Sequence, residues 1–297
     1  MWRGLFTAAT GMITETRRTD VIANNLANAA TTGYKKDTAV HHEFESMMIQ
    51  RMYDHEDGNK FGVQGNGLLD TSSRDITQFK GFGVNQDNAP KIGQLGLGDY
   101  IDEIAVDYSQ GSFESTGNTF DLAIAGDGFF TVQTPQGVRY TRNGAFFKNQ
   151  NGVIQDIRGY DLLDTRGLPI TIPADVADSR VSVSGDGSIF VNGQRLTSVA
   201  PNEQNAVPVQ IQLVQFNDRL AIQKQGDNLF YAVNDAQPET ATGEIVQGML
   251  EKSNVEIVRE MVELIHNHRL YEANSKAVTT QDTMLDASVN QLGRLGS

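Results

Sequence analysis

Histidines and acidic residues gather at one place in the chain where a metal site could form. His41 and His42 are adjacent, and Glu43, Glu45 and His55 follow them. A metal site needs side chains that converge on one point, whereas adjacent residues point to different sides of a helix or a strand. The sequence therefore predicts a solvated polar stretch at this place and no metal.

Three aspartates each follow a glycine, in a pattern that could suggest calcium loops. They are Asp127, Asp186 and Asp227. Calcium takes about six to eight oxygen ligands, and none of these three stretches supplies enough of them. Gly-Asp pairs are also frequent in tight turns, which is the interpretation we favour.

Motifs for nucleotide binding or nucleophilic catalysis are missing from the sequence. No glycine-rich run ends in Gly-Lys-Ser or Gly-Lys-Thr, and there is no Gly-x-Ser-x-Gly elbow. Gly93, Gly96 and Gly98 have the wrong spacing for a dinucleotide loop. His266 and His268 stand two apart in a predicted helix and cannot share a face. We therefore expect no catalytic residue, no cofactor and no enzymatic activity.

Charge distinguishes the middle of the chain from its ends. The 297 residues carry a net charge of -13, with +3 in residues 1–36, -2 in residues 249–297 and therefore -14 in residues 37–248. An acidic surface repels nucleic acid and anionic lipid, so we expect neither as a partner. The absence of cysteine excludes a disulfide framework and a cysteine-based metal site.

No stretch of the sequence predicts direct membrane insertion. No apolar run approaches the roughly 20 residues that a spanning helix needs. Residues 1–12 are briefly apolar, but the chain turns polar directly afterwards and lacks a cleavage site of the usual kind. If the protein leaves the cytoplasm, we expect a route that does not read a standard signal.

The first of the elements that must position any site is a helix over residues 2 to about 28. Steps of four and three join its members Leu5, Ala9, Met12, Thr16, Thr19, Ala23 and Leu26. These residues form one stripe on a helix, and Gly33 beyond it is a plausible stop. The stripe is weakly apolar, so it suits close packing but buries little area by itself.

The last segment has the clearest helical period. Steps of four and three continue without a break through Ile257, Met261, Leu264, His268, Tyr271, Ser275, Val278, Asp282, Leu285, Val289 and Leu292. Ser253 and Asn254 are expected to cap the helix, with Glu256 and Glu260 in its first turns. The stripe predicts a coiled-coil seam, and the alternative is an amphipathic helix on the protein's own core.

The region between the helices reads as short strands and turns. Alternating apolar residues flank Pro135-Gln136-Gly137, and residues 209–213 form another alternating run. Four dipeptides are typical of hairpin turns: Asn143-Gly144, Asn151-Gly152, Asp186-Gly187 and Asn192-Gly193. By contrast, residues 54–100 are rich in glycine and polar residues without a sustained period, so we expect a long connector, partly extended and mobile.

The expected fold class is therefore α+β. A coiled-coil-like terminal domain combines an N-terminal helical segment, residues 1–36, with a C-terminal one, residues 246–297. Residues 37–104 are expected to form the irregular connector. Residues 105–245 are expected to form an all-β domain, either a barrel or a folded sheet of hairpins.

Several motifs in order along the chain resemble the flagellar basal-body rod protein family, which also includes hook proteins. Near the start these are residues 20–28 (DVIANNLAN) and 31–35 (TTGYK), and near the end residues 248–255 (GMLEKSNV) and 269–276 (RLYEANSK). Between them, residues 111–112, 116–118, 121–124, 126–130 and 140–144 resemble the β domain that rod and hook proteins share. Both the distal and the proximal rod type remain open.

The resemblance implies a structural subunit that leaves by the flagellar type III export apparatus and polymerises helically to transmit torque. Expected partners are other copies and neighbouring rod and hook subunits, outside the cytoplasm in the periplasm or cell wall zone. The alternative is a secreted binding module or adhesin. The expected assembly interface comprises Leu5, Met12, Ala23, Asn24, Asn25, Leu26, Asn28, Gly33, Leu250, Glu251, Ser253, Asn254, Ile257, Met261, Leu264, Tyr271, Glu272, Asn274, Val278 and Leu285.

Overall fold

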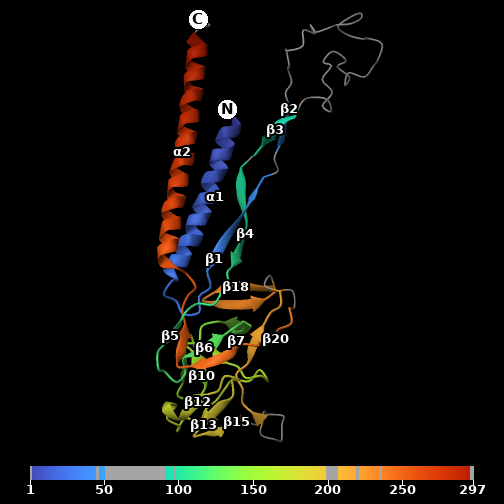
Figure 1. The fold of residues 1–297 in the computed structure, drawn as a ribbon, viewed down its shortest axis with the longest axis vertical. Coiled ribbons are helices and arrows are strands. Elements are labelled where there is room, and N and C mark those ends of the chain that lie inside the picture. Colours follow the sequence, from blue (N-terminus) through green and yellow to red (C-terminus); the bar gives the residue numbers. More distant parts are fainter. Residues whose placement is uncertain are drawn as a thin grey trace, which may run out of the picture. The chain divides into compact units, whose positions relative to one another are not determined.

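The computed structural model describes residues 2–44, 47–50, 91–96, 98–198, 207–218, 221–233 and 236–294. Within these residues the fold is α+β, as predicted. Along the chain, helix α1 (Trp2–Ala27) precedes the strands and helix α2 (Ile257–Arg294) follows them (labelled in Figure 1). The chain divides into two compact units. Unit 1 comprises Met1–Arg17, Val40–Glu103 and His268–Ser297, and unit 2 comprises Arg18–Ala39 and Ile104–Asn267.

The described strands of unit 2 include an open antiparallel sheet of nine strands. Its order is β18-β19-β8-β7-β11-β10-β9, and β17 pairs with both β7 and β20. The strands are β7 (Phe129–Thr134), β8 (Gly137–Thr141), β9 (Phe146–Lys148), β10 (Ile154–Asp156), β11 (Asp161–Leu162), β17 (Leu213–Gln215), β18 (Ile222–Gly226), β19 (Leu229–Ala232) and β20 (Glu239–Thr240).

Smaller strand groups complete unit 2. A three-stranded sheet contains β12 (Val181–Val183), β13 (Ile189–Val191) and β14 (Gln194–Arg195), preceded by a 3-10 turn at Asp178–Arg180. Three antiparallel pairs join β15 (Thr197–Ser198) to β16 (Val207–Pro208), β6 (Leu122–Ala125) to β21 (Glu244–Gln247), and β5 (Phe113–Ser115) to β22 (Met249–Glu251). The last two pairs fix the chain just before α2 against the β region.

Unit 1 contains most of an extended ribbon that follows α1. Strand β1 (Asp37–Glu43) pairs with β4 (Asp99–Val106), and β2 (Met47–Gln50) pairs with β3 (Lys91–Leu95). Residues 51–90 of the predicted connector lie outside the described residues. The described part of residues 37–104, predicted as an irregular, partly extended connector, contains β1, β2, β3 and most of β4. The paired strands lie far apart in sequence, so local periodicity does not reveal their pairing.

Turn chemistry predicts most of the hairpins correctly. Asn192 and Gly193 have φ of 54° and 78°, as a two-residue turn between β13 and β14 requires. Asn151-Gly152 and Asp186-Gly187 also join paired strands. The hairpin expected at Asn143-Gly144 is wrong, since β8 and β9 pair with other strands. The carbonyl of Gly144 instead accepts a hydrogen bond from the amide of Leu122 at 3.0 Å. The two backbones lie too close together for a side chain at position 144.

The core of unit 2 lies among these strands. Its main cluster is formed by Phe120, Leu122, Ile124, Phe130, Val132, Phe146, Ile154, Leu162, Ile170, Ile172, Val181, Ile189, Val209, Ile211, Leu229 and Ile245. A second cluster is aromatic, with Phe129 and Phe230 rings 5.3 Å apart. Each such side chain contributes about 1.5 to 3 kcal/mol when fully buried, so the β region supplies a stable base for the segments that dock on it.

Candidate assembly interface

Asn25 ties the last turns of α1 to the chain that follows. Its Nδ2 donates to the carbonyl of Asp37 at 2.7 Å, and its Oδ1 accepts the amide of Asp37 at 2.9 Å. The hydroxyl of Tyr34 donates to the same Oδ1 at 3.2 Å. The Asn25 side chain is 1% exposed. Because these polar groups are all buried, each needs a hydrogen-bond partner within the protein. The conformation of residues 34–37 therefore depends on the side-chain amide of Asn25.

Gly33 brings this segment against the backbone of the β region. Its φ is +66°, and a Cβ there would lie 2.6 Å from the amide nitrogen of Asn143 while also overlapping the carbonyl of Arg142. The Gly33 amide donates to the carbonyl of Glu251 at 2.7 Å. Only glycine combines this conformation with so close an approach.

Two cations share one carboxylate beneath the segment. Lys35 Nζ lies 2.7 Å from Glu251 Oε1, and Arg142 Nη1 lies 3.3 Å from Oε2 (1%, 1% and 4% exposed). Burial lowers the pKa of Lys35 and of Arg142, while Glu251 acts in the opposite direction. A buried pair of this kind adds little net stability, but removing one partner leaves an uncompensated charge at a cost of about 3 to 5 kcal/mol.

Further charged and polar groups surround this trio. Lys224 Nζ lies 2.6 Å from Asp37 Oδ1 and 4.2 Å from the centre of the Tyr34 ring. Lys36 pairs with Glu260 of α2, and its amide donates to Asn254 Oδ1 at 2.7 Å. The segments before and after the β region are therefore held to each other as well as to the strands.

A cavity of about 290 Å³ lies beside Arg142. Several of its lining groups are engaged with nearby backbone. Asp107 Oδ1 accepts the amide of Ser109 at 2.9 Å, and Gln110 Nε2 donates to the carbonyl of Ile124 at 2.7 Å. These bonds hold the loop whose Ser109 carbonyl accepts Lys35 Nζ at 2.8 Å. The cavity therefore lies where residues 32–37 pack against the β region and residues 249–254, a place that we call the docking site.

The predicted cap of α2 is wrong, since the helix begins only at Ile257. Asn254 is used elsewhere, with Nδ2 donating to the carbonyl of Asp107 at 2.8 Å. Ser253 Oγ accepts the amide of Val255 at 3.2 Å, before the helix starts. The acidic first turn is confirmed by Glu260.

Polar and small residues make the contact between the two helices. In unit 2, Asn267 Nδ2 donates to Thr19 Oγ1 at 2.6 Å, and Arg18 pairs with Glu263 at 3.9 Å. In unit 1, a Cβ on Gly11 would lie 2.8 Å from Asn274 Nδ2, and one on Gly4 would overlap Gln281. Glu260, Asn267, Asn274 and Gln281 recur every seven residues along α2, so this polar row faces α1.

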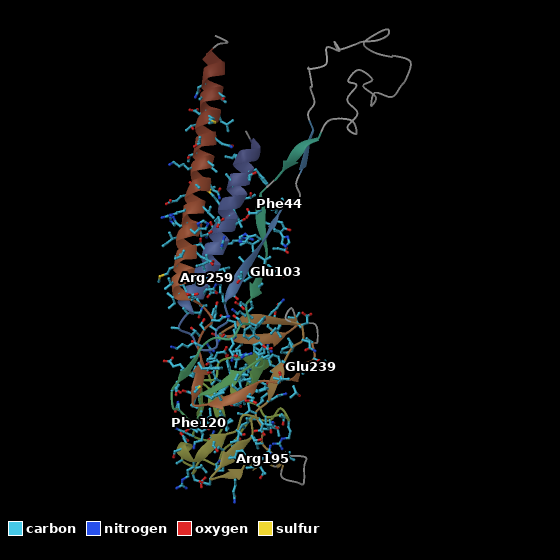
Figure 2. All side chains as sticks on the ribbon, viewed as in Figure 1. Phe44, Glu103, Phe120, Arg195, Glu239 and Arg259 are labelled. Carbon is cyan, nitrogen blue, oxygen red and sulfur yellow. The ribbon has the colours of Figure 1, made fainter. Side chains whose placement is uncertain are left out.

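Large apolar residues at the start of α2 remain exposed in unit 2. Ile257, Val258, Met261, Val262 and Ile265 are 47% to 71% exposed; we call them the α2 apolar face. They occupy the first turns of the helix, where Figure 2 labels Arg259. Exposed apolar groups of this size on neighbouring turns are typical of protein–protein contacts.

The structure places the predicted interface residues in three environments. Four are buried in the docking site: Asn25, Gly33, Glu251 and Ser253. Ten are half-buried: Leu5, Met12, Leu26, Asn28, Leu250, Asn254, Leu264, Asn274, Val278 and Leu285. Six are exposed: Ala23, Asn24, Ile257, Met261, Tyr271 and Glu272.

Sequence reasoning does not select several residues that hold the docking site together. Lys35 and Arg142 stand inside motifs that carry the family resemblance, so a signal for them exists. Lys224 stands between two glutamines in β18 and has no such signal. The sequence indicates Glu260 only as an acid near the start of a helix, whereas its burial to 1% depends on Lys36 and Asn25.

Of the residues that could suggest metal chemistry, Glu45 and His55 lie outside the described residues, whereas His41, His42 and Asp186 have other partners. His41 Nδ1 and His42 Nε2 each lie 3.7 Å from a carboxylate oxygen, of Asp99 and Asp102 respectively. Among the described residues, no three histidine or acidic side chains gather as a metal site. Asp186 accepts the amide and the hydroxyl of Ser188, as the predicted turn requires. No helix in the described part of the chain is both long and apolar enough to cross a membrane.

A β region that anchors two long helices, with apolar residues turned toward solvent, is typical of a structural protein that assembles through its helices. Three family descriptions match the chain: Flagella basal body rod protein (residues 5–35), Flagellar hook protein FlgE/F/G D1 domain (123–191) and Flagellar basal body rod FlgEFG protein C-terminal (246–292).

Full-length relatives agree with these matches. The chain is 32% identical to the flagellar basal-body rod protein FlgG of Buchnera aphidicola from Schizaphis graminum, over 95% of this chain and 96% of the relative. It is 31% identical to FlgG of Bacillus subtilis, over 98% and 99%. It is also 31% identical to the rod protein FlgF of Caulobacter vibrioides, over 99% and 100%. The chain belongs to the flagellar basal-body rod protein family. The adhesin alternative gains no support from these relatives.

Proposed function

We propose that this chain is a structural subunit of the flagellar basal-body rod and that it polymerises with other copies through its terminal helices. It is not an enzyme, because the rod proteins to which it is related are structural subunits. The observation that carries the assembly mechanism is the α2 apolar face, whose five residues are exposed although the helix already contacts α1.

The occupant of this face is a second copy of the chain. In unit 2, the exposed side of α1 carries small residues, including Ala23 and Ala27, to which large side chains can approach closely. One copy therefore offers the large apolar surface and the small surface together, as a repeating head-to-tail contact needs. The first 36 residues carry +3 and the last 49 carry -2, which adds a modest attraction that salt screens.

Charges on the α2 apolar face test this mechanism. Met261→Asp and Ile265→Asp, made separately, should abolish self-association in sedimentation over a concentration series and prevent complete basal bodies in cells. Their unassembled chains should unfold at the same urea concentration as the unchanged protein, because both positions are exposed. Val138→Asp, at a 42% exposed residue of β8, is the matched control and should assemble normally.

Normal assembly of both α2 variants would refute the mechanism. Leu264 and Leu285, also on the predicted stripe, are half-buried within the chain, so charges there would disturb the unassembled protein as well. The exposed positions separate assembly from folding more sharply.

The flagellar type III export apparatus is the proposed route out of the cytoplasm, and the N-terminal region is its proposed address. The proposed location is the basal body, in the periplasm or cell wall zone, with rod and hook subunits as neighbours. Deleting residues 2–36 should leave the protein in the cytoplasm, as measured by cell fractionation. Export of the truncated chain at the normal level would show that the address lies elsewhere.

A further inference from the structure

The N-terminal segment, residues 32–37, buries a cation that needs a partner from the other end of the chain. Lys35 Nζ donates to two acceptors, Glu251 Oε1 at 2.7 Å and the Ser109 carbonyl at 2.8 Å. Glu251 is the carboxylate of the pair, and it belongs to β22 in residues 249–254, which we call the C-terminal segment. An ammonium group that is buried with a carbonyl as its only partner is unfavourable. The N-terminal segment therefore docks stably only when Glu251 is already in place.

The dependence in the opposite direction is weaker. Glu251 Oε1 also accepts the amide of Gly111 at 3.0 Å, and Oε2 pairs with Arg142 at 3.3 Å. Both donors come from the β region. Without Lys35 the Glu251 carboxylate therefore keeps a cation and a backbone amide, and the C-terminal segment can dock with its charge compensated.

Backbone contacts show the same asymmetry. The C-terminal segment pairs its strand β22 with β5, and the amide of Lys252 donates to the carbonyl of Ser112 at 2.8 Å. These bonds involve no residue before position 112. By contrast, the backbone amides of the N-terminal segment bond to the C-terminal segment. The amide of Gly33 donates to the carbonyl of Glu251, and the amide of Lys36 donates to the side-chain Oδ1 of Asn254. The C-terminal segment completes the surface on which the N-terminal segment lies.

We infer that the two segments dock in a fixed order, with residues 249–254 first and residues 32–37 second, and that Glu251 is the anion that compensates the buried charge of Lys35. The pairing of Glu260 with Lys36 forms in the second step. The N-terminal segment then stays undocked until the end of the β region has folded. If the chain is an exported rod subunit, as proposed above, this order keeps the N-terminal region accessible during export; the docking order itself does not depend on that function.

Hydrogen exchange on the full-length unassembled chain tests the order directly. In refolding with pulse labelling, the amides of Leu250 and Lys252, which face β5, should become protected before those of Gly33 and Lys36. Simultaneous protection, or protection of Gly33 and Lys36 first, would overturn the inference. This measurement involves no assembly, so its result is independent of whether the chain forms rods.

Variants at equilibrium test the role of the charge pair. Glu251→Gln should speed exchange at Gly33 and Lys36 on the order of 100-fold, because the buried ammonium loses its anion. Lys35→Met keeps the length of the side chain and removes the charge, so exchange at the amides of Leu250 and Lys252 should stay within about threefold of the unchanged protein.

The double variant Lys35→Met with Glu251→Gln separates the charge effect from general damage. It removes Lys35, the one of the two cations paired with Glu251 that belongs to the N-terminal segment, so protection at Gly33 and Lys36 should recover at least about tenfold relative to Glu251→Gln alone. Protection that stays lost in the double variant would mean that Glu251 acts only through packing. Loss of protection at Leu250 and Lys252 in Lys35→Met would mean that docking is mutual, and either result rejects the inference.

Discussion

Two neighbouring asparagines near the end of α1 differ in exposure and in their hydrogen-bond partners. Asn24 and Asn25 are neighbours of the same type, but Asn24 is exposed and, within the described part of the chain, its carbonyl and Oδ1 bond to the nearby Asn28. Asn25 is buried, and its side chain hydrogen-bonds to the backbone of Asp37 and to the hydroxyl of Tyr34. The pair therefore offers an internal comparison between a surface amide and a structural one.

Asn25→Ala should destabilise the chain by about 2 to 4 kcal/mol, because it leaves buried donors and acceptors without partners. Urea unfolding, together with exchange at the Asp37 amide, measures the effect. Asn24→Ala is the matched control and should change the free energy of unfolding by about 0.5 kcal/mol or less. Equal effects of the two substitutions would contradict a structural role for the Asn25 amide.

Asp156 gives a pH dependence with a definite sign. It is 3% exposed, and burial raises its pKa above 3.8, although the Ile157 amide at 2.6 Å and Arg158 act in the opposite direction. Between the unfolded and the folded pKa, the folded state binds more proton, so this group's contribution to stability falls as pH rises.

Asp156→Asn removes that titration. Relative to the unchanged protein, the variant should become progressively more stable as pH rises through the window above 3.8. Urea unfolding of both proteins over a pH series measures the difference. A difference that is constant with pH, or that shrinks as pH rises, would contradict a raised pKa for Asp156.

Among the elements, α1 and α2 contact each other through polar and small groups. In unit 1, Gly11 lies against the flexible amide of Asn274, which can turn away from a small added group. Gly11→Ala should therefore be tolerated, with the higher helix propensity of alanine offsetting the closer contact. A larger side chain has no such space.

Gly11→Leu should separate the helices in unit 1 and speed exchange of the amides of residues 270–285. Thr16→Leu is the matched control, because Thr16 is exposed on the same helix and its substitution should leave that exchange unchanged. Identical exchange in Gly11→Leu and in the unchanged protein would show that the close approach at Gly11 does not determine helix packing.

For the molecule as a whole, the β region should fold without the terminal helices. Its main core cluster runs from Phe120 to Ile245, but β21 and β22 extend to residue 251 and pair with β6 and β5. The end of the β domain predicted from sequence, residue 245, falls inside β21. A stable fragment should therefore reach beyond it.

A fragment of residues 104–252 should melt cooperatively and resist protease. A fragment of residues 104–243 should melt at a lower temperature, because it loses the strand that pairs with β6 and the burial of Ile245. Circular dichroism on heating and limited proteolysis measure both. Absence of a cooperative transition in the longer fragment would show that the terminal segments are needed for the β region to fold.

Features that depend on local chemistry can be predicted from the amino-acid order alone. The long helix at each end follows from period, and the turns at Asn192-Gly193 and Asp186-Gly187 follow from residues that adopt positive φ without strain. The protein family can be recognised from several motifs that occur in a fixed order along the chain. These signals lie within a few residues of one another, so no knowledge of long-range contacts is needed to read them.

Which residues meet depends instead on the folded chain. A seven-residue period fits several stripes on α2, and the side turned to α1 is the polar row of Glu260, Asn267, Asn274 and Gln281. Likewise, Lys35, Arg142 and Glu251 are separated by more than 100 residues each, and nothing local indicates that they share one buried site. Their convergence depends on strand pairing across the whole β region, which sequence periodicity does not specify.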